Sequence, residues 1–172
     1  MNYLLENQET ERLSFRKLLP SDFDAWLAFH QDPITSKFWN GLPPDPIKAC
    51  EQDFERTFYR YQNNLGGKLA LILKSSNTLI GLAGLLIQEV NNKKELEIAY
   101  SLLPSYWKKG YATEAAKQCK VFAKTEQLAN SLISIIHMNN IPSQKVAVAN
   151  GMYLDEATTY HNNPVYIYRV KI

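Results

Sequence analysis

The hydrophobic positions of the N-terminal half follow two different periods. Leu13 and Phe15 alternate with polar residues, which is typical of a strand with one buried face. Further along, Cys50, Phe54 and Phe58 recur at helical spacing, which indicates a helix with one apolar side. The expected elements are a strand over Arg12–Leu19, helices that begin near Pro20 and Pro46, and strands over Lys68–Lys74 and Thr78–Val90.

The C-terminal half continues with more strands and two further helices. Pro104 ends an alternating strand, and the helix that follows carries a stripe of small residues that includes Ala112, Ala115 and Ala116. Such a stripe lets a helix lie close against a sheet. Expected here are strands over Glu95–Leu103, Ser131–Met138, Met152–Tyr160 and Val165–Ile172, and helices over Tyr111–Glu126 and Ile141–Asn150.

Composition and charge exclude several classes of function. The 172 residues are 45% hydrophobic and 21% charged, which is typical of a soluble protein with a hydrophobic core. One domain is expected over residues 1–172. A net charge of +2 is too small to indicate nucleic-acid binding. Cys50 and Cys119 fall on apolar helix positions, which favours buried free thiols over a disulfide or a metal site. No metal is expected, since no zinc-ligand spacing occurs.

The N-terminal and apolar segments predict neither secretion nor membrane insertion. Met1–Glu11 lacks the basic start and apolar run of a signal peptide. The longest apolar run, Leu79–Ile87, is well short of the ~20 residues that span a bilayer. We therefore expect a cytoplasmic protein with no membrane partner.

The segment Tyr106–Glu114, which reads Y-W-K-K-G-Y-A-T-E, joins a predicted strand to the small-residue helix. Unpaired N–H groups and the helix dipole favour an anion at a helix start. Gly110 lets the backbone approach that anion closely, and Lys108 and Lys109 add positive charge. The pattern predicts a phosphate-binding loop, although simple solvent exposure would also explain the lysines. It matches neither the loop of nucleotide hydrolases nor the dinucleotide fingerprint.

The same segment resembles motif A of the GCN5-related N-acetyltransferases, usually written Q/R-x-x-G-x-G/A. Trp107 stands at the first position, Gly110 at the first glycine and Ala112 at the last position. The string Y-W-x-K-G-Y-A-T-E-A is similar to the branch of ribosomal-protein N-terminal acetyltransferases, with Lys108 where glycine is common. Downstream, Asn140–Met152 resembles the family segment N-x-x-S-x-x-V…N-G-F/M, and Thr10–Arg16 resembles its T-E-R-L-x-F-R opening.

The resemblance, which covers nearly the whole chain, implies a fold and a coenzyme. The fold is α+β with three layers, the acyl-CoA N-acyltransferase fold: a mixed, mostly antiparallel central sheet of about seven strands with helices on both faces. Its fourth and fifth strands splay apart and admit acetyl-coenzyme A, whose pyrophosphate binds the loop. The implied coenzyme-binding residues are Leu102, through its backbone, and Lys108, Lys109, Gly110, Tyr111, Ala112, Thr113, Asn140 and Ser143.

Glu97 is an acidic residue in a strand that should be apolar on both sides. Strand alternation places Glu97 on one face together with Glu95, and places Tyr100 on the opposite face with Ile98. A glutamate in such a strand must face a cleft, pair with a cation or lie near a strand end. In the family, a glutamate at this position often takes a proton from the amine, and partial burial would raise its pKa into a useful range. A catalytic base, a salt bridge and an exposed strand end all stay open for Glu97. Glu95, nearer the turn, is expected to be solvated.

The proton donor is less evident, because the tyrosine that many family members use is replaced by Ala147. Ser143 matches a serine that lies near the coenzyme sulfur in the ribosomal-protein branch, and a helix cap is its alternative role. Tyr153 is a fallback acid, and His137 is more typical of a core or rim residue than of a base. Phe38, Trp39 and Tyr59 are candidate walls of the acceptor site, and a place in the core is their alternative.

These observations predict an acetyl-CoA-dependent N-acetyltransferase. Its acceptor would be a primary amine, on a protein N-terminus or a small molecule, that attacks the thioester directly in a ternary complex, since no activated Cys or Ser nucleophile is evident. The alternative is a CoA-binding sensor or scaffold without turnover, which the missing tyrosine keeps open. A homodimer is compatible with the resemblance.

Overall fold

The computed structural model describes all of residues 1–172, built on a seven-stranded sheet in the order β1-β2-β3-β4-β5-β7-β6. The strands are β1 (Leu13–Arg16), β2 (Gly66–Leu73), β3 (Thr78–Val90), β4 (Lys93–Leu102), β5 (Ser131–His137), β6 (Tyr153–Tyr160) and β7 (Asn163–Lys171). The helices are α1 (Phe23–Gln31), α2 (Pro46–Gln62), α3 (Tyr111–Thr125) and α4 (Ile141–Ala149), with short 3-10 turns at Pro20–Asp22, Pro33–Ser36 and Pro104–Tyr106. Only the β4–β5 pair is parallel, so the predicted mixed, mostly antiparallel sheet is confirmed.

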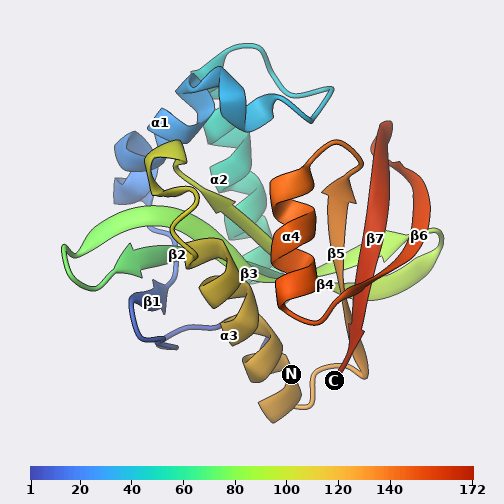
Figure 1. The fold of residues 1–172 in the computed structure, drawn as a ribbon. Helices are drawn as coiled ribbons and strands as arrows, with labels where there is room; N and C mark the ends of the chain where they lie inside the picture. Colours follow the sequence, from blue (N-terminus) through green and yellow to red (C-terminus); the bar gives the residue numbers. More distant parts are fainter.

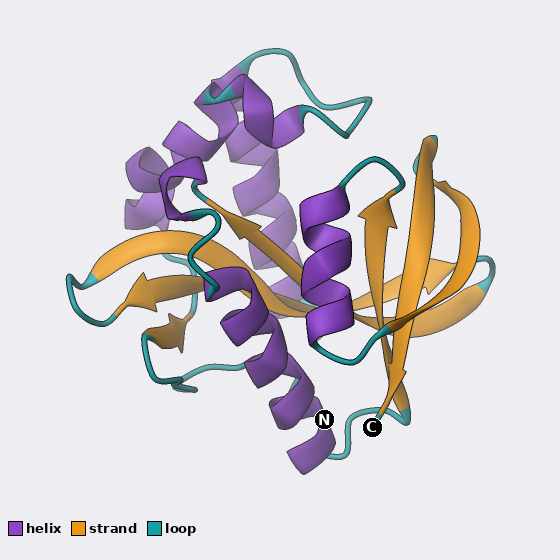
Figure 2. Cartoon of the chain, viewed as in Figure 1, coloured by secondary structure: helices purple, strands orange, loops and turns teal.

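Helices cover both faces of the sheet, as Figures 1 and 2 show. Alternate residues of β2 demonstrate why: Ala70 and Ile72 pack with Trp26 and Phe54 from α1 and α2, whereas Leu69 and Leu71 belong to the core beneath α3. Side chains of a strand point alternately to opposite faces, so a strand covered on both sides is apolar throughout. The small-residue stripe of α3 is buried against this second core, as its pattern predicts.

The fourth and fifth strands diverge. Their parallel pairing is restricted to Glu97 opposite Ile133, while every other pair of neighbouring strands shares a longer register. Beyond this point Ser134 Oγ donates to the carbonyl of Ile98 at 3.0 Å, so a side chain replaces the ladder. Figure 1 shows the two strands separating toward their C-terminal ends, with α4 in front of the space between them. The gap expected from the resemblance is therefore present.

Two local expectations are corrected. The first strand ends at Arg16 rather than Leu19, because Asp22 pairs with Arg16 (2.7 Å) and accepts from the Leu19 N–H (2.8 Å), which turns the chain. Glu95 is not a solvated residue, since it forms a two-pronged ion pair with Arg169 of β7 at 2.8 and 3.1 Å. Both cysteines are buried and free, as predicted. No helix combines the length and the apolar character that crossing a membrane requires.

Candidate active site in the gap between β4 and β5

The predicted phosphate-binding loop ends in an uncapped helix start. Gly110 is the N-cap of α3 with φ of +83°, and no side chain caps the helix. The N–H groups from Lys108 to Thr113 donate no hydrogen bond within the chain. Lys108 also adopts a left-handed φ of +61°, a conformation that occurs in the concave runs of N–H groups that bind anions. Such a run is suited to an anion.

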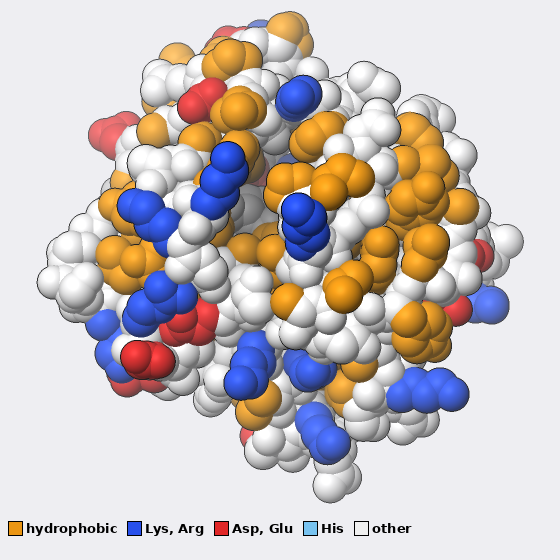
Figure 3. All heavy atoms as spheres, viewed as in Figure 1, with side chains coloured by type: hydrophobic (Ala, Val, Ile, Leu, Met, Phe, Trp, Pro, Cys, Tyr) orange, Lys and Arg blue, Asp and Glu red, His pale blue; other side chains and the backbone are white.

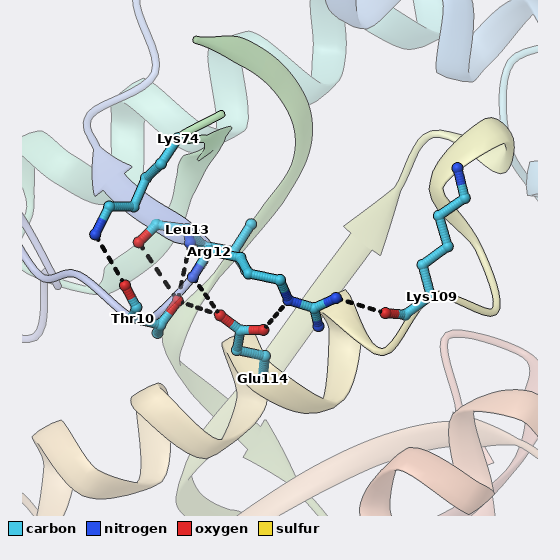
Figure 4. Close-up of polar contacts among 6 residues, drawn as sticks. All are labelled: Thr10, Arg12, Leu13, Lys74, Lys109 and Glu114. Carbon is cyan, nitrogen blue, oxygen red and sulfur yellow. Dashed lines mark hydrogen bonds and ion pairs between the residues drawn. The ribbon is translucent and has the colours of Figure 1, made fainter. Parts of the chain in front are cut away.

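A polar network holds this loop against the N-terminal segment (Figure 4). Glu114 accepts hydrogen bonds from Thr10 Oγ1 at 2.5 Å and from the Arg12 N–H and Nε at 2.9 and 2.7 Å. Arg12 Nη1 in turn donates to the carbonyl of Lys109 at 2.9 Å. Burial by itself would raise the pKa of Glu114, but these hydrogen bonds have the larger combined effect, so its pKa is lowered and the carboxyl stays ionised. Arg12 thus neutralises a carboxylate that would otherwise repel an anion, a role that the sequence pattern did not reveal.

The divergence of β4 and β5 opens a cavity of about 340 Å³. Residues 97–101 of β4 and residues 134–137 of β5 form its walls, and Asn140 and Ser143 line it from the start of α4. Figure 3 shows a hollow beside α4 on the face that carries several lysine and arginine side chains. The structure therefore brings Glu97, Asn140 and Ser143 together, while Lys108–Thr113 lie outside this cavity.

Glu97 faces the cavity and is 7% exposed. Its Oε2 accepts a hydrogen bond from Gln88 Nε2 of β3 at 2.7 Å. Burial raises the pKa of Glu97 to about 6, against the opposing effects of this hydrogen bond and of the charges on Lys68 and Arg60. No cation lies within salt-bridge distance of its carboxyl. Glu97 therefore faces a cleft and does not form an ion pair. A carboxyl with such a pKa can accept and release a proton near neutral pH.

The start of α4 presents polar groups to the same cavity. Asn140 is the N-cap, since its Oδ1 accepts from the Ser143 N–H at 3.2 Å, so the alternative of Ser143 as the cap is wrong. The Tyr100 hydroxyl of β4 donates to the carbonyl of Ser143 at 3.2 Å. Burial raises the pKa of Tyr100 to about 12, although hydrogen bonding to Ser143 opposes this. Tyr100 was read from the sequence only as a member of the apolar face.

Leu102 lies beyond the cavity, at the end of β4. The N–H of Leu103 pairs with Ile80 of β3, and alternate residues of a strand direct their backbone groups to opposite sides. The backbone of Leu102 is therefore directed to the β5 side, where its carbonyl accepts from Trp107 Nε1 at 2.8 Å. Its N–H stays available along the gap.

Of the other predicted residues, some reach the cavity and others do not. Trp39 and His137 line it, and His137 Nδ1 accepts from the Asn139 N–H at 3.1 Å. Tyr59 and Tyr153 are 60% and 47% exposed and lie outside the lining, so Tyr59 is not a wall of this cavity. The cavity is also lined by polar residues of α2 and β2 that no sequence pattern indicated, namely Asp53, Arg56, Thr57, Arg60 and Lys68.

A seven-stranded sheet with one diverging parallel pair, an uncapped helix start and a cavity in the gap defines an acyl-CoA acyltransferase fold. Residues 12–153 match the family model described as an acetyltransferase (GNAT) domain, which shows that the chain belongs to this family. The family predicted from the motif A and Asn140–Met152 segments is thus confirmed.

Known relatives agree with this assignment. The chain is 26% identical, over 83% of its length and 79% of the relative's, to an uncharacterized N-acetyltransferase p20 from Bacillus licheniformis. An acetyltransferase structure from Agrobacterium tumefaciens superposes with a TM-score of 0.82 at 24% identity, covering 100% of this chain and 98% of that one. RimL, a ribosomal L7/L12 alpha-N-protein acetyltransferase in complex with coenzyme A, shares the fold with a TM-score of 0.74 at 15% identity, over 96% and 97% of the two chains.

Proposed function

We propose that this protein is an acetyl-CoA-dependent N-acetyltransferase that acts on a primary amine in the cytoplasm. The observation that carries the proposal is the conjunction of the uncapped N–H groups of Lys108–Thr113 with a cavity that contains the buried carboxyl of Glu97. The first feature is suited to a diphosphate and the second to proton removal from an amine. The acceptor is an amine on a small molecule or a protein N-terminus.

Acetyl-CoA binds along the gap in this proposal. The backbone N–H groups of Gly110, Tyr111, Ala112 and Thr113 hold its diphosphate, and the side chains of Lys108 and Lys109 and the Thr113 hydroxyl add contacts. The N–H of Leu102 and the side chain of Asn140 hold the pantetheine arm, and Ser143 lies beside the sulfur. These groups supply binding and orientation, which place the thioester between β4 and β5.

The reaction is a direct acyl transfer. The amine nitrogen forms a bond to the thioester carbonyl carbon while Glu97 accepts the proton that the nitrogen loses. The carbon–sulfur bond then breaks, and the leaving thiolate takes a proton from a neighbouring hydroxyl. No step requires a covalent enzyme intermediate, in keeping with the buried state of both cysteines, whose pKa values burial raises to about 12.

The Tyr100 hydroxyl, next to Ser143, is the proposed proton source for the thiolate, because Ala147 leaves the helix without a tyrosine. Tyr100→Phe should therefore lower kcat by roughly 10²-fold and change the affinity for CoA little. Tyr168→Phe is a matched control, since Tyr168 donates to Gln144 of α4 at 3.2 Å but does not line the cavity. Equal kcat values for the two variants, measured by CoA release, would remove Tyr100 as the donor.

The function is tested by supplying acetyl-CoA with a panel of amines and N-terminal peptides and measuring CoA release together with the acetylated product. We expect release that depends on the acceptor. Tight CoA binding without release from any acceptor would favour the sensor or scaffold instead. Displacement of bound CoA by ATP or NAD would contradict both readings.

A further inference from the structure

The cavity has a positively charged end that the proposed chemistry does not use. Asp53, Arg56, Thr57 and Arg60 share one side of α2 and line the cavity together with Lys68 of β2. This end is close to the proposed base, since Lys68 and Arg60 line the same cavity as Glu97 and their charges lower its pKa. Three cations thus face a cavity whose only acidic members are Asp53 and Glu97.

Asp53 forms no hydrogen bond with the two cations nearest to it, Lys68 and Arg56. Its Oδ2 accepts from Trp26 Nε1 at 2.8 Å and lies 3.2 Å from His30 Nε2. Its Oδ1 is 3.9 Å from Lys68 Nζ and 3.8 Å from Arg56 Nη2, which is ion-pair distance but too long for a hydrogen bond. Neither Lys68 nor Arg56 donates a side-chain hydrogen bond within the chain. Both residues line the cavity, and the Arg56 side chain is 62% exposed.

Arg60 has a different role. It donates to the carbonyls of Leu65 and Ile87 at 3.1 and 3.0 Å and to Gln88 Oε1 at 2.9 Å, and Gln88 holds Glu97. Arg60 is therefore a positioning residue for the base. Lys68 lacks any such partners, although its side chain is only 19% exposed. Its ammonium group lines the cavity and has Asp53 at ion-pair distance without a hydrogen bond, so its N–H donors are free to bind an anion that enters the cavity.

We propose that the amine acceptor carries an acidic group, a carboxylate or a phosphate, which Lys68 and Arg56 bind while the amine faces Glu97. This inference rests on the proposed N-acetyltransferase function and narrows its acceptor to small acidic amines. The diphosphate of the coenzyme does not account for these cations, because none of Lys108–Thr113 lines the cavity. Polycationic amines are excluded by the same charges, since repulsion from Lys68 and Arg56 would oppose their entry.

The test compares pairs of amines that differ only in the acidic group: β-alanine against 3-aminopropanamide, and O-phosphoethanolamine against ethanolamine. Rates of CoA release are compared per concentration of unprotonated amine. The acidic member of at least one pair should have a kcat/KM about 10-fold or more above its neutral counterpart, the size expected for one charge-assisted contact. The two pairs distinguish a carboxylate from a phosphate.

Arg56→Gln should reduce this preference toward equality, and it is the cleaner variant because Lys68 also lowers the pKa of Glu97. Lys48→Gln, an exposed cation on the same helix, is the control and should keep the preference. Equal or faster acetylation of the neutral amines would overturn the inference and leave the N-acetyltransferase function in place. Bound CoA without release from these amines or from the wider panel would overturn both.

Discussion

Glu97→Gln should lower kcat by roughly 10²- to 10⁴-fold, the usual contribution of a general base, and leave the affinity for CoA nearly unchanged. The glutamine keeps the size of the side chain and can accept the hydrogen bond from Gln88, but it cannot take a proton from the amine. Steady-state CoA release and CoA titration measure the two quantities separately. Glu95→Gln is the matched control, because Glu95 belongs to the same strand and pairs with Arg169 outside the cavity.

The pH dependence gives a second readout of the same base. Only the ionised carboxyl accepts a proton, so kcat/KM of the wild type should rise as the pH rises through about 6, the pKa that burial gives Glu97. Glu97→Gln should lack this rise, while any titration of the amine itself remains. A wild-type profile that persists unchanged in the variant would exclude Glu97 as the base.

A stability measurement shows that the variant is folded. Glu97 binds its proton more tightly in the folded protein, where its pKa is about 6, than at the ordinary value of 4.5 in the unfolded chain. The wild type therefore loses about 2 kcal/mol of its free energy of unfolding as the pH rises through 6. Glutamine has no such cost, so the variant should melt higher than the wild type near pH ~8 and similarly near pH ~4. Lost activity with retained or raised Tm separates chemistry from folding.

Gly110→Val should abolish most coenzyme binding, with an increase in Kd of about 10² or more. The φ of +83° is strained for any L residue and most of all for a β-branched one, at about 1–3 kcal/mol. A Cβ would also lie 3.3 Å from Arg12 Nη2. The Arg12 side chain can move aside, but the strain at this φ is relieved only by a shift of the backbone, which displaces the N–H groups. The branched side chain also covers them.

Gly41→Val separates this local effect from strain in general. Gly41 has the same φ of +83°, but nothing lies within 4 Å of an added Cβ, and its loop is far from α3 in the chain. Both variants should lower Tm, whereas only Gly110→Val should lose CoA affinity by calorimetric titration. A normal CoA affinity of Gly110→Val would contradict the assignment of the phosphate-binding loop.

The elements of the fold were readable because each has a local signature. The period of two in Leu13 and Phe15 and the helical spacing of Phe54 and Phe58 reflect side-chain geometry within one segment. The end of β1 was not readable in this way. It depends on Asp22, whose carboxylate bonds Arg16 and the Leu19 N–H, and those contacts exist only after the chain has turned.

The candidate site was predictable in part. Glu97 was singled out because a carboxyl is improbable in a strand covered on both faces, and the structure indeed turns it to a cavity. Tyr100 was assigned to the opposite face by strand alternation, yet both residues line the cavity. The alternation argument assumes a neighbouring strand on each side, and β5 has already diverged at this point, so the cavity reaches around the edge of β4.

The sequence by itself determined the order of the elements, the acetyltransferase family, the loop at Gly110 that we propose binds an anion, and the presence of an unusual glutamate. These properties are carried by residues that lie within one segment or one motif. Only the tertiary structure decided what surrounds Glu97. Gln88, Arg60 and Lys68 come from β3, α2 and β2, and Tyr100 meets Ser143 across the gap. Burial and charge at one carboxyl depend on segments far apart in the chain, so no local pattern encodes them.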